Sequence, residues 1–173
     1  GEKILAAFRK AFPGMNEAYA LHYDTAFLPP TVEYVEKKAK EASAPVYNYL
    51  FNLVFDVDGG KAAWHCSDIP YFFHNGEMVP VCHQEAGDML DQVMSGAFVN
   101  FARTGNPNCP GLPQWEPCSE GKLVTMEFGP TCAAKVNLHQ ELLPLVLQYQ
   151  PPFTPPAPAP EGDDEESGNA WVF

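Results

Sequence analysis

The stretch AAWHCSDIPYFF, residues 62–73, says more about the architecture than any other part of the chain. It places one histidine, His65, in a turn-prone loop soon after a strand predicted over residues 46–55. Proteins of the α/β class carry active sites on loops at the carboxyl ends of parallel strands. Imidazole has an ordinary pKa that allows proton transfer near neutral pH. His65 is therefore a candidate proton carrier, although the pattern by itself favours a structural histidine packed beside Trp64.

The strand predicted before this loop is the reason to expect a parallel sheet. Residues 46–55 are dense in aromatic and β-branched side chains, which is typical of a strand buried on both faces. The Asp and Gly content of residues 56–60 predicts a turn, and residues 123–128 predict a second, short strand.

Four helices are predicted around these strands from their apolar periodicity. The longest covers residues 85–104, with Gly105 at the position of a left-handed C-cap and Pro107 just beyond it. The other three are expected over residues 3–12, 32–41 and 137–149. Two strands and four helices do not close a sheet-centred core, because a strand with two apolar faces needs a neighbour on each edge. The chain is therefore interpreted as an incomplete α/β sheet with helices packed on it, part of something larger.

Composition changes sharply near residue 150. Residues 151–160 contain six prolines, and an acidic run follows over residues 161–166. We expect one domain over residues 1–150 and a flexible Pro-rich and acidic tail over residues 151–173. A stand-alone protein that docks through the tail residues Trp171–Phe173 is a further reading.

Charge and cysteine usage exclude several classes of partner. The formal net charge is -12 and no basic stripe is present, which argues against nucleic-acid binding. No apolar run approaches the ~20 residues that span a bilayer, so a membrane is not an expected partner either. The five cysteines have no C-x-x-C spacing, which favours free thiols in a reducing, cytoplasmic setting. No metal or other cofactor is expected, because His65, His74, His83 and Cys82 match no tetrahedral zinc pattern.

The histidine loop resembles that of the type-B carboxylesterases, the family of para-nitrobenzyl esterases, cholinesterases and liver carboxylesterases. Their loop runs roughly G-A-x-H-G-x-E-L-P-Y-V-F, and the matching residues here are Ala63, His65, Asp68 in place of Glu, Ile69, Pro70, Tyr71 and Phe73. A second block, FVNFARTGNPN at residues 98–108, resembles the family's W-x-N-F-A-R-T-G-D-P-N. The two blocks keep the family's order and separation, and the resemblance covers roughly residues 3–149. It implies the C-terminal portion of an α/β-hydrolase fold.

The resemblance also implies roles for single residues. His65 would be the general base and acid of a serine triad. Asp68 occupies the place of the family's loop glutamate and is expected to brace the loop rather than to serve as the triad acid. Trp64, Tyr71 and Phe72 are candidates to wall an ester pocket or to brace the loop, although these aromatics fit a core equally well. Cys66 replaces a family glycine and would have to adopt the backbone angle that glycine supplies.

The triad partners of His65 are absent from this sequence. In α/β-hydrolases the triad follows the order Ser, acid, His, so a C-terminal piece can keep the histidine alone. None of the five serines lies in G-x-S-x-G. Ser67 and Asp68 are immediate neighbours of this loop histidine, and their side chains point apart from its ring, so a local triad is not expected.

The functional expectation is a carboxylic-ester hydrolase that acts on small-molecule esters. The remainder of the hydrolase domain, from the same gene or a partner chain, would supply the nucleophile and the acid, and this chain alone is expected to be inactive. The alternative is a non-catalytic α/β-hydrolase-like interaction module, as in neuroligins.

Overall fold

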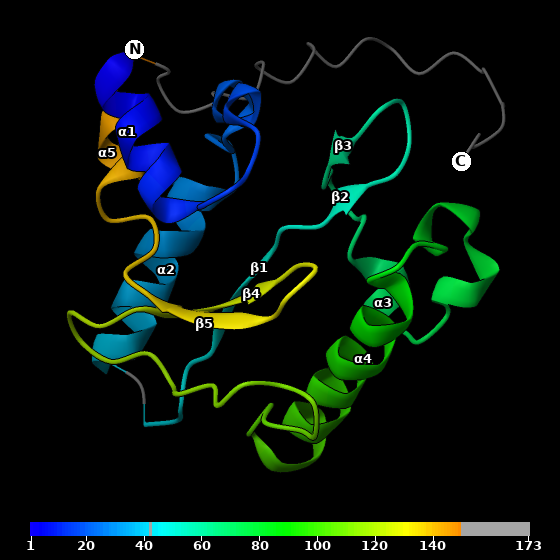
Figure 1. The fold of residues 1–173 in the computed structure, drawn as a ribbon. Helices are drawn as coiled ribbons and strands as arrows, with labels where there is room; N and C mark the ends of the chain where they lie inside the picture. Colours follow the sequence, from blue (N-terminus) through cyan, green and yellow to red (C-terminus); the bar gives the residue numbers. More distant parts are fainter. Residues whose placement is uncertain (42, 150–173) are drawn as a thin grey trace, which may run out of the picture.

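The computed structural model describes residues 1–41 and 43–149, which form a mixed arrangement of helices and strands (Figure 1). In chain order the elements, in which η marks a 3-10 helix, are α1 (Glu2–Ala11), η1 (Glu17–His22), α2 (Leu28–Glu41), β1 (Asn48–Phe51), β2 (Val54–Phe55), β3 (Lys61–Ala62), α3 (Ile69–Phe72), η2 (Gly76–Met78), η3 (Pro80–Cys82), α4 (Gly87–Thr104), β4 (Val124–Phe128), β5 (Ala133–Val136) and α5 (Leu142–Leu147). The domain boundary predicted at residue 150 and the predicted tail, with its docking segment, lie outside the described residues.

The main sheet has three strands in the order β1-β4-β5. β1 runs parallel to β4, with Asn48 opposite Thr125, as the sequence predicts. β5 is antiparallel to β4, with Val124 opposite Val136. β4 matches the predicted strand, whereas β5 was not predicted, because its sequence Ala-Ala-Lys-Val carries little of the residue pattern of a strand.

The segment predicted as one strand forms two short ones. The chain leaves the main sheet after Phe51, and β2 then pairs with β3 in a small hairpin whose turn holds Asp58, Gly59 and Gly60 at positive φ. The prediction that residues 46–55 are buried on both faces is wrong for β1, where Tyr49 is exposed. The reason is position: β1 is the edge strand of the described sheet, whereas the central strand β4 is buried almost throughout.

The four predicted helices are present, with shifted ends. α4 ends where predicted, and Gly105 adopts φ +74° while its N–H donates to the Phe101 carbonyl at 2.8 Å. α2 begins at Leu28, earlier than predicted, because Pro29 and Pro30 fit the first turn of a helix, where no N–H donor is required. A one-turn helix, α3, lies within the predicted histidine loop.

The apolar side chains form two clusters. The larger lies between the sheet and helices α3 and α4, and its fully buried members include Phe55, Leu90, Met94 and Phe128. The smaller joins α1, η1 and α5; Figure 1 shows α1 beside α5, with α3 and α4 beyond the strands. Lys10 of α1 forms an ion pair with Glu141, just before α5.

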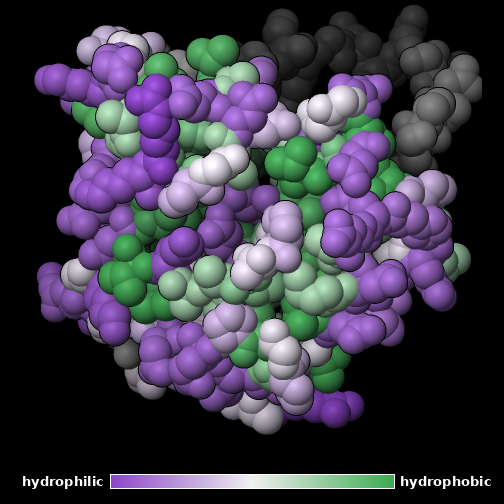
Figure 2. Space-filling model, in the orientation of Figure 1, coloured by the Kyte–Doolittle hydropathy of each residue, from purple (hydrophilic) through white to green (hydrophobic). Residues whose placement is uncertain are grey.

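Some apolar side chains stay at the surface. Figure 2 shows apolar patches among the hydrophilic side chains of the face drawn there. Among the exposed aromatic residues are Phe27, of which 60% is accessible, and Tyr34, of which 61% is accessible. In the part of the chain that the structure describes, none of the helices combines the length and the apolar character needed to cross a bilayer.

Candidate active site

The histidine loop is a tight turn closed by Ser67. The Ser67 Oγ accepts a hydrogen bond from the Trp64 N–H at 3.1 Å and donates one to the Trp64 carbonyl at 2.7 Å. The Ser67 backbone N–H donates to the same carbonyl at 3.0 Å. These bonds satisfy a buried hydroxyl group and fold the loop back on itself, while His65 stays exposed. No pattern along the chain indicated this role of Ser67.

Cys66 adopts the backbone conformation expected from its place in the loop. Its φ is +68°, in the left-handed region that favours glycine. The expectation that cysteine takes a glycine-like angle here is therefore confirmed. Such a conformation costs a residue with a Cβ roughly 1 kcal/mol or more, so the loop stores some strain beside His65.

His65 lies at the rim of a cavity with a volume of about 750 Å³. One wall of this cavity is formed by the histidine loop, another by residues 47–52 around β1, and the rest by side chains from residues 8–35 and by His139. The imidazole stacks on the ring of Phe27, with the centroids 5.2 Å apart and the planes 5° from parallel. The histidine is thus held face-on while the edges of its ring stay available for hydrogen bonds.

Asp68 connects the loop to the sheet. Its Oδ2 accepts a hydrogen bond from the Tyr49 hydroxyl group at 2.9 Å, and Tyr49 belongs to β1. Burial raises the pKa of Tyr49 above its ordinary value, and the Asp68 carboxylate adds to the increase. Among the described residues no hydrogen bond joins Asp68 to His65. The bond thus links the histidine loop to β1, and the bracing role of Asp68 stays a prediction.

The three aromatic candidates lie in different environments. Trp64 lines the cavity, packs on Phe55 with ring centroids 4.5 Å apart, and carries the Lys61 ammonium group 4.7 Å above its ring. Tyr71 is fully buried, and burial raises the pKa of its phenol. Phe72 packs edge-on against aromatic rings of β1 and β4. The side chains of Tyr71 and Phe72 lie beneath the loop and do not line the cavity.

A buried tyrosine–histidine pair escaped the sequence analysis. The Tyr23 hydroxyl group lies 2.6 Å from His139 Nδ1, and both side chains line the cavity that His65 borders. Burial raises the pKa of Tyr23 and lowers the pKa of His139 to about 4, against an opposing effect of Asp24. The tyrosine therefore keeps its proton and the imidazole is neutral; when the imidazole proton is on Nε2, the tyrosine hydroxyl group donates to Nδ1. The two residues are far apart in the chain, and neither belongs to a local motif.

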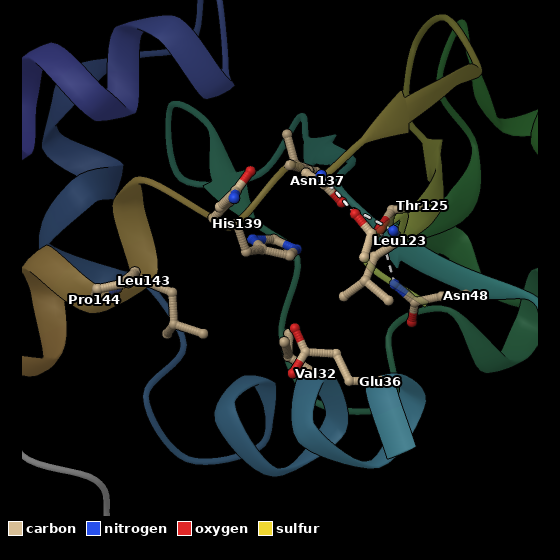
Figure 3. Close-up of a pocket in the computed structure, with 12 residues that line it drawn as sticks. Val32, Glu36, Asn48, Leu123, Thr125, Asn137, His139, Leu143 and Pro144 are labelled. Atoms are coloured by element: carbon tan, nitrogen blue, oxygen red, sulfur yellow. Dashed lines mark hydrogen bonds between the residues drawn. The ribbon is translucent and has the colours of Figure 1, made fainter. Parts of the chain in front are cut away.

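His139 also borders a second, smaller cavity of about 330 Å³ between α2 and the β5–α5 connection. In Figure 3 its ring points into this space, with Glu36 and Val32 of α2 across from it. Asn48 and Thr125 close one end and share a hydrogen bond of 2.8 Å. His139 thus lines both cavities, and its contact with Tyr23 joins the segment before α2 to the C-terminal segment.

The second sequence block, residues 98–108, holds the end of α4 against the loop that follows it. The Asn100 side chain donates to the Asn108 carbonyl at 2.7 Å, and Asn108 in turn bonds the backbone of Trp115 on both sides. These bonds fasten the end of α4 to the following loop. Arg103 is exposed on the last turn of α4.

Metal-binding and disulfide chemistry find no support in the described residues. Among residues 1–41 and 43–149, no cluster of three or more His, Cys, Asp or Glu side chains is arranged to hold a metal ion. All five cysteines are described and are free thiols. Burial raises the pKa of the thiols of Cys109, Cys118 and Cys132, which keeps them protonated and unreactive.

Two relatives each match most of this chain. An esterase from Clostridium hathewayi, described as able to hydrolyse aliphatic aromatic polyesters, is 40% identical and superposes with a TM-score of 0.81, over 85% of this chain and 29% of its own. Bile salt-activated lipase of Mus musculus is 28% identical over 157 residues, which are 79% of this chain and 26% of the lipase. The chain thus spans less than a third of the length of these relatives.

Two further comparisons concern the fold and the family. The Geobacillus stearothermophilus carboxylesterase EST55 is 20% identical with a TM-score of 0.59, over 83% of this chain and 31% of its own, which shows a shared α/β-hydrolase fold. The predicted fold class, a partial α/β-hydrolase sheet with helices packed on it, is therefore confirmed. The model of the carboxylesterase family matches residues 13–143, most of the described chain. The chain belongs to the carboxylesterase family and forms a C-terminal portion of its α/β-hydrolase fold.

Proposed function

We propose that this chain supplies the proton-transferring histidine of a serine carboxylic-ester hydrolase. The observation that carries the proposal is the placement of His65, which is exposed at the rim of a cavity of about 750 Å³. Its ring is held by stacking and not by hydrogen bonds within the described residues. An imidazole held in this way can exchange a proton with a group that enters the cavity, which is what a triad histidine must do.

The proposed chemistry is acyl transfer through a serine supplied by the remainder of the hydrolase domain. His65 removes the proton of that serine as its oxygen attacks the ester carbonyl, and then gives the proton to the leaving alcohol. In the second half His65 takes a proton from water, which attacks the acyl-serine, and returns it to the serine oxygen as the acid leaves. Both acylation and deacylation require the His65 imidazole to face the cavity.

The remainder of the hydrolase domain is the proposed protein partner. β1 has β4 on one edge, and within the described residues its other edge is unpaired. Residues 47–52, which include β1, line the cavity, so backbone N–H and C=O groups of that edge are open to pairing. A strand added there would lie next to β1 and bring its carboxyl end close to the histidine loop, because parallel strands end at the same edge.

A small-molecule ester is the proposed substrate. The cavity wall beside His65 is largely apolar and aromatic, with Phe27, Trp64 and Phe51 among its members. Apolar walls with a few polar groups are typical of sites that bind an acyl or alkyl portion. The Clostridium hathewayi esterase can hydrolyse aliphatic aromatic polyesters, which supports the proposal that the substrate ester carries an aromatic group.

The proposal extends to the compartment. Five free thiols are ordinary for a protein of a reducing cytoplasm, and we propose that setting here. Thiol titration of unfolded protein, purified from its native cells without reductant, should find all five cysteines reactive. A lower value would place the protein in an oxidising compartment.

The test of the function uses the chain extended by the region that precedes it in its own gene. The extended protein should hydrolyse a p-nitrophenyl ester, and His65→Gln should lower kcat by about 10³-fold or more. The matched control is His83→Gln, an exposed histidine whose Nε2 bonds only the Glu77 carbonyl and which should leave the rate unchanged. An inactive extended protein would favour the non-catalytic interaction module, and near-full activity of His65→Gln would exclude His65 as the proton carrier.

A further inference from the structure

We propose that Phe27 is a positioning residue for His65: its ring lies flat against the imidazole and fixes the plane in which the histidine presents its nitrogens to the cavity. The inference rests on the proposed function, because it assigns a role to Phe27 in the hydrolase reaction. Phe27 lies in the segment before α2, outside both sequence blocks, so neither block indicated its contact with the histidine loop.

The geometry of the pair is that of a stack. The two ring centroids are 5.2 Å apart and the planes are 5° from parallel, within the range of offset-stacked aromatic pairs. Phe27 is 60% exposed, so burial in a core does not explain where its ring lies. The imidazole is the single aromatic partner that the described residues give to Phe27.

The main chain around Phe27 is fixed on both sides. The Asp24 Oδ1 accepts hydrogen bonds from the N–H groups of Ala26 at 2.8 Å and Phe27 at 2.9 Å, which closes the turn before α2. The Phe27 carbonyl accepts from the Thr31 N–H at 3.1 Å and from the Thr31 Oγ1 at 2.7 Å, which joins it to the first turn of α2. The ring is thus carried by a rigid part of the backbone.

The stack leaves both nitrogens of His65 free for chemistry. A hydrogen bond would hold a histidine by occupying a nitrogen, whereas a face-to-face contact holds the plane and leaves the ring edges open. Proton transfer at a short distance depends steeply on the orientation of the ring, so a looser ring should react more slowly even when the substrate still binds.

Two variants test the stack, with one control. Phe27→Leu keeps an apolar side chain and removes the aromatic face, whereas Phe27→Tyr keeps the face. Tyr34→Leu is the matched control, because Tyr34 is 61% exposed on α2, the helix that follows Phe27, and the described residues show no aromatic contact between Tyr34 and His65. Both positions are exposed, so none of the three variants should unfold the chain.

The first readout is proton NMR of the 173-residue chain, with the His65 ring signals assigned by comparison with His65→Gln. A stacked ring shifts the His65 Cε1 proton upfield. We expect this shift to disappear in Phe27→Leu and to persist in Phe27→Tyr and Tyr34→Leu. Identical His65 signals in Phe27→Leu and the parent chain would overturn the proposal.

The second readout is steady-state hydrolysis by the extended protein. Phe27→Leu should lower kcat by about tenfold with little change in KM, and Phe27→Tyr should restore kcat. A change in KM alone would show that Phe27 is a wall of the substrate site and not a positioning residue. The NMR measurement does not depend on catalysis. An inactive extended protein would therefore refute the proposed hydrolase function, whereas the NMR result alone would decide whether Phe27 stacks on His65.

Discussion

Replacing His139 by asparagine should make the chain less sensitive to mild acid. The substitution keeps an oxygen that can accept the hydrogen bond of the Tyr23 hydroxyl group, but removes the group that titrates. In the parent chain His139 is 6% exposed and its Nδ1 lies 2.6 Å from the tyrosine oxygen, where it accepts the bond when the ring proton is on Nε2. Protonation of Nδ1 would remove the acceptor and leave a buried cation, so the folded state resists it.

The direction and the magnitude of this pH effect on stability follow from the pKa of His139 in the folded and the unfolded chain. Burial lowers it from 6.5 to about 4 in the folded chain, so the unfolded chain takes up the proton first as the pH falls. The contribution of His139 to stability is therefore present above about pH 6.5 and is lost as the pH falls towards about 4. Between about pH 7 and about pH 5, the linkage relation gives a loss of about 2 kcal/mol.

The measurement is urea unfolding, followed by tryptophan fluorescence, at about pH 7, 6 and 5. The free energy of unfolding of the parent should fall by about 2 kcal/mol more over this range than that of His139→Asn. Carboxylates and histidines that both proteins contain contribute equally to the pH dependence of unfolding, so their contributions cancel when the two proteins are compared. His83→Asn, a change at an exposed site, should follow the parent. Parallel curves for the parent and His139→Asn would refute the reasoning.

Three further predictions concern stability and are measured by thermal unfolding. Cys66→Gly should stabilise the chain by about 0.5–1 kcal/mol, because glycine adopts φ +68° without strain; a lower Tm would contradict this. Tyr49→Phe should cost about 0.5–1.5 kcal/mol, because it removes the hydroxyl group that donates to the loop carboxylate; an unchanged Tm would show that this bond does not brace the loop. Gly87→Ala should cost about 1–3 kcal/mol, because its Cβ would lie 2.1 Å from a backbone oxygen, whereas Gly96→Ala in the same helix should be neutral or stabilising; equal effects would refute the argument.

Local chemistry made several parts of this fold predictable. Gly105 follows the apolar period of a long helix, and glycine is the residue that most easily takes the left-handed angle that ends it. The turn of the β2–β3 hairpin was visible in its Asp and Gly residues, three of which have positive φ. The loop around His65 was found because its residue types match a family pattern, and Cys66 takes the angle that the pattern implies. Each of these features depends on residues that are neighbours in the chain.

Other features could not be predicted, because their partners come together only in the folded chain. Residues 46–55 have the composition of one buried strand, but the strand divides because Val54 and Phe55 pair with a hairpin partner and β1 is an edge. β5 has a weak strand sequence and forms because β4 offers it a ladder of backbone donors and acceptors. In both cases the neighbours of a segment outweighed its own preference.

The sequence by itself indicated the α/β-hydrolase fold, through two blocks that resemble a family pattern, and singled out His65 as a candidate proton carrier, since such motifs are local. Only the tertiary structure decided what surrounds His65: the stack with Phe27, the hydrogen bond from Tyr49 to the loop carboxylate, and the buried bond from Tyr23 to His139. The physical reason is that such contacts are chosen by packing and desolvation among segments as far apart as 116 positions, and no spacing along the chain records them.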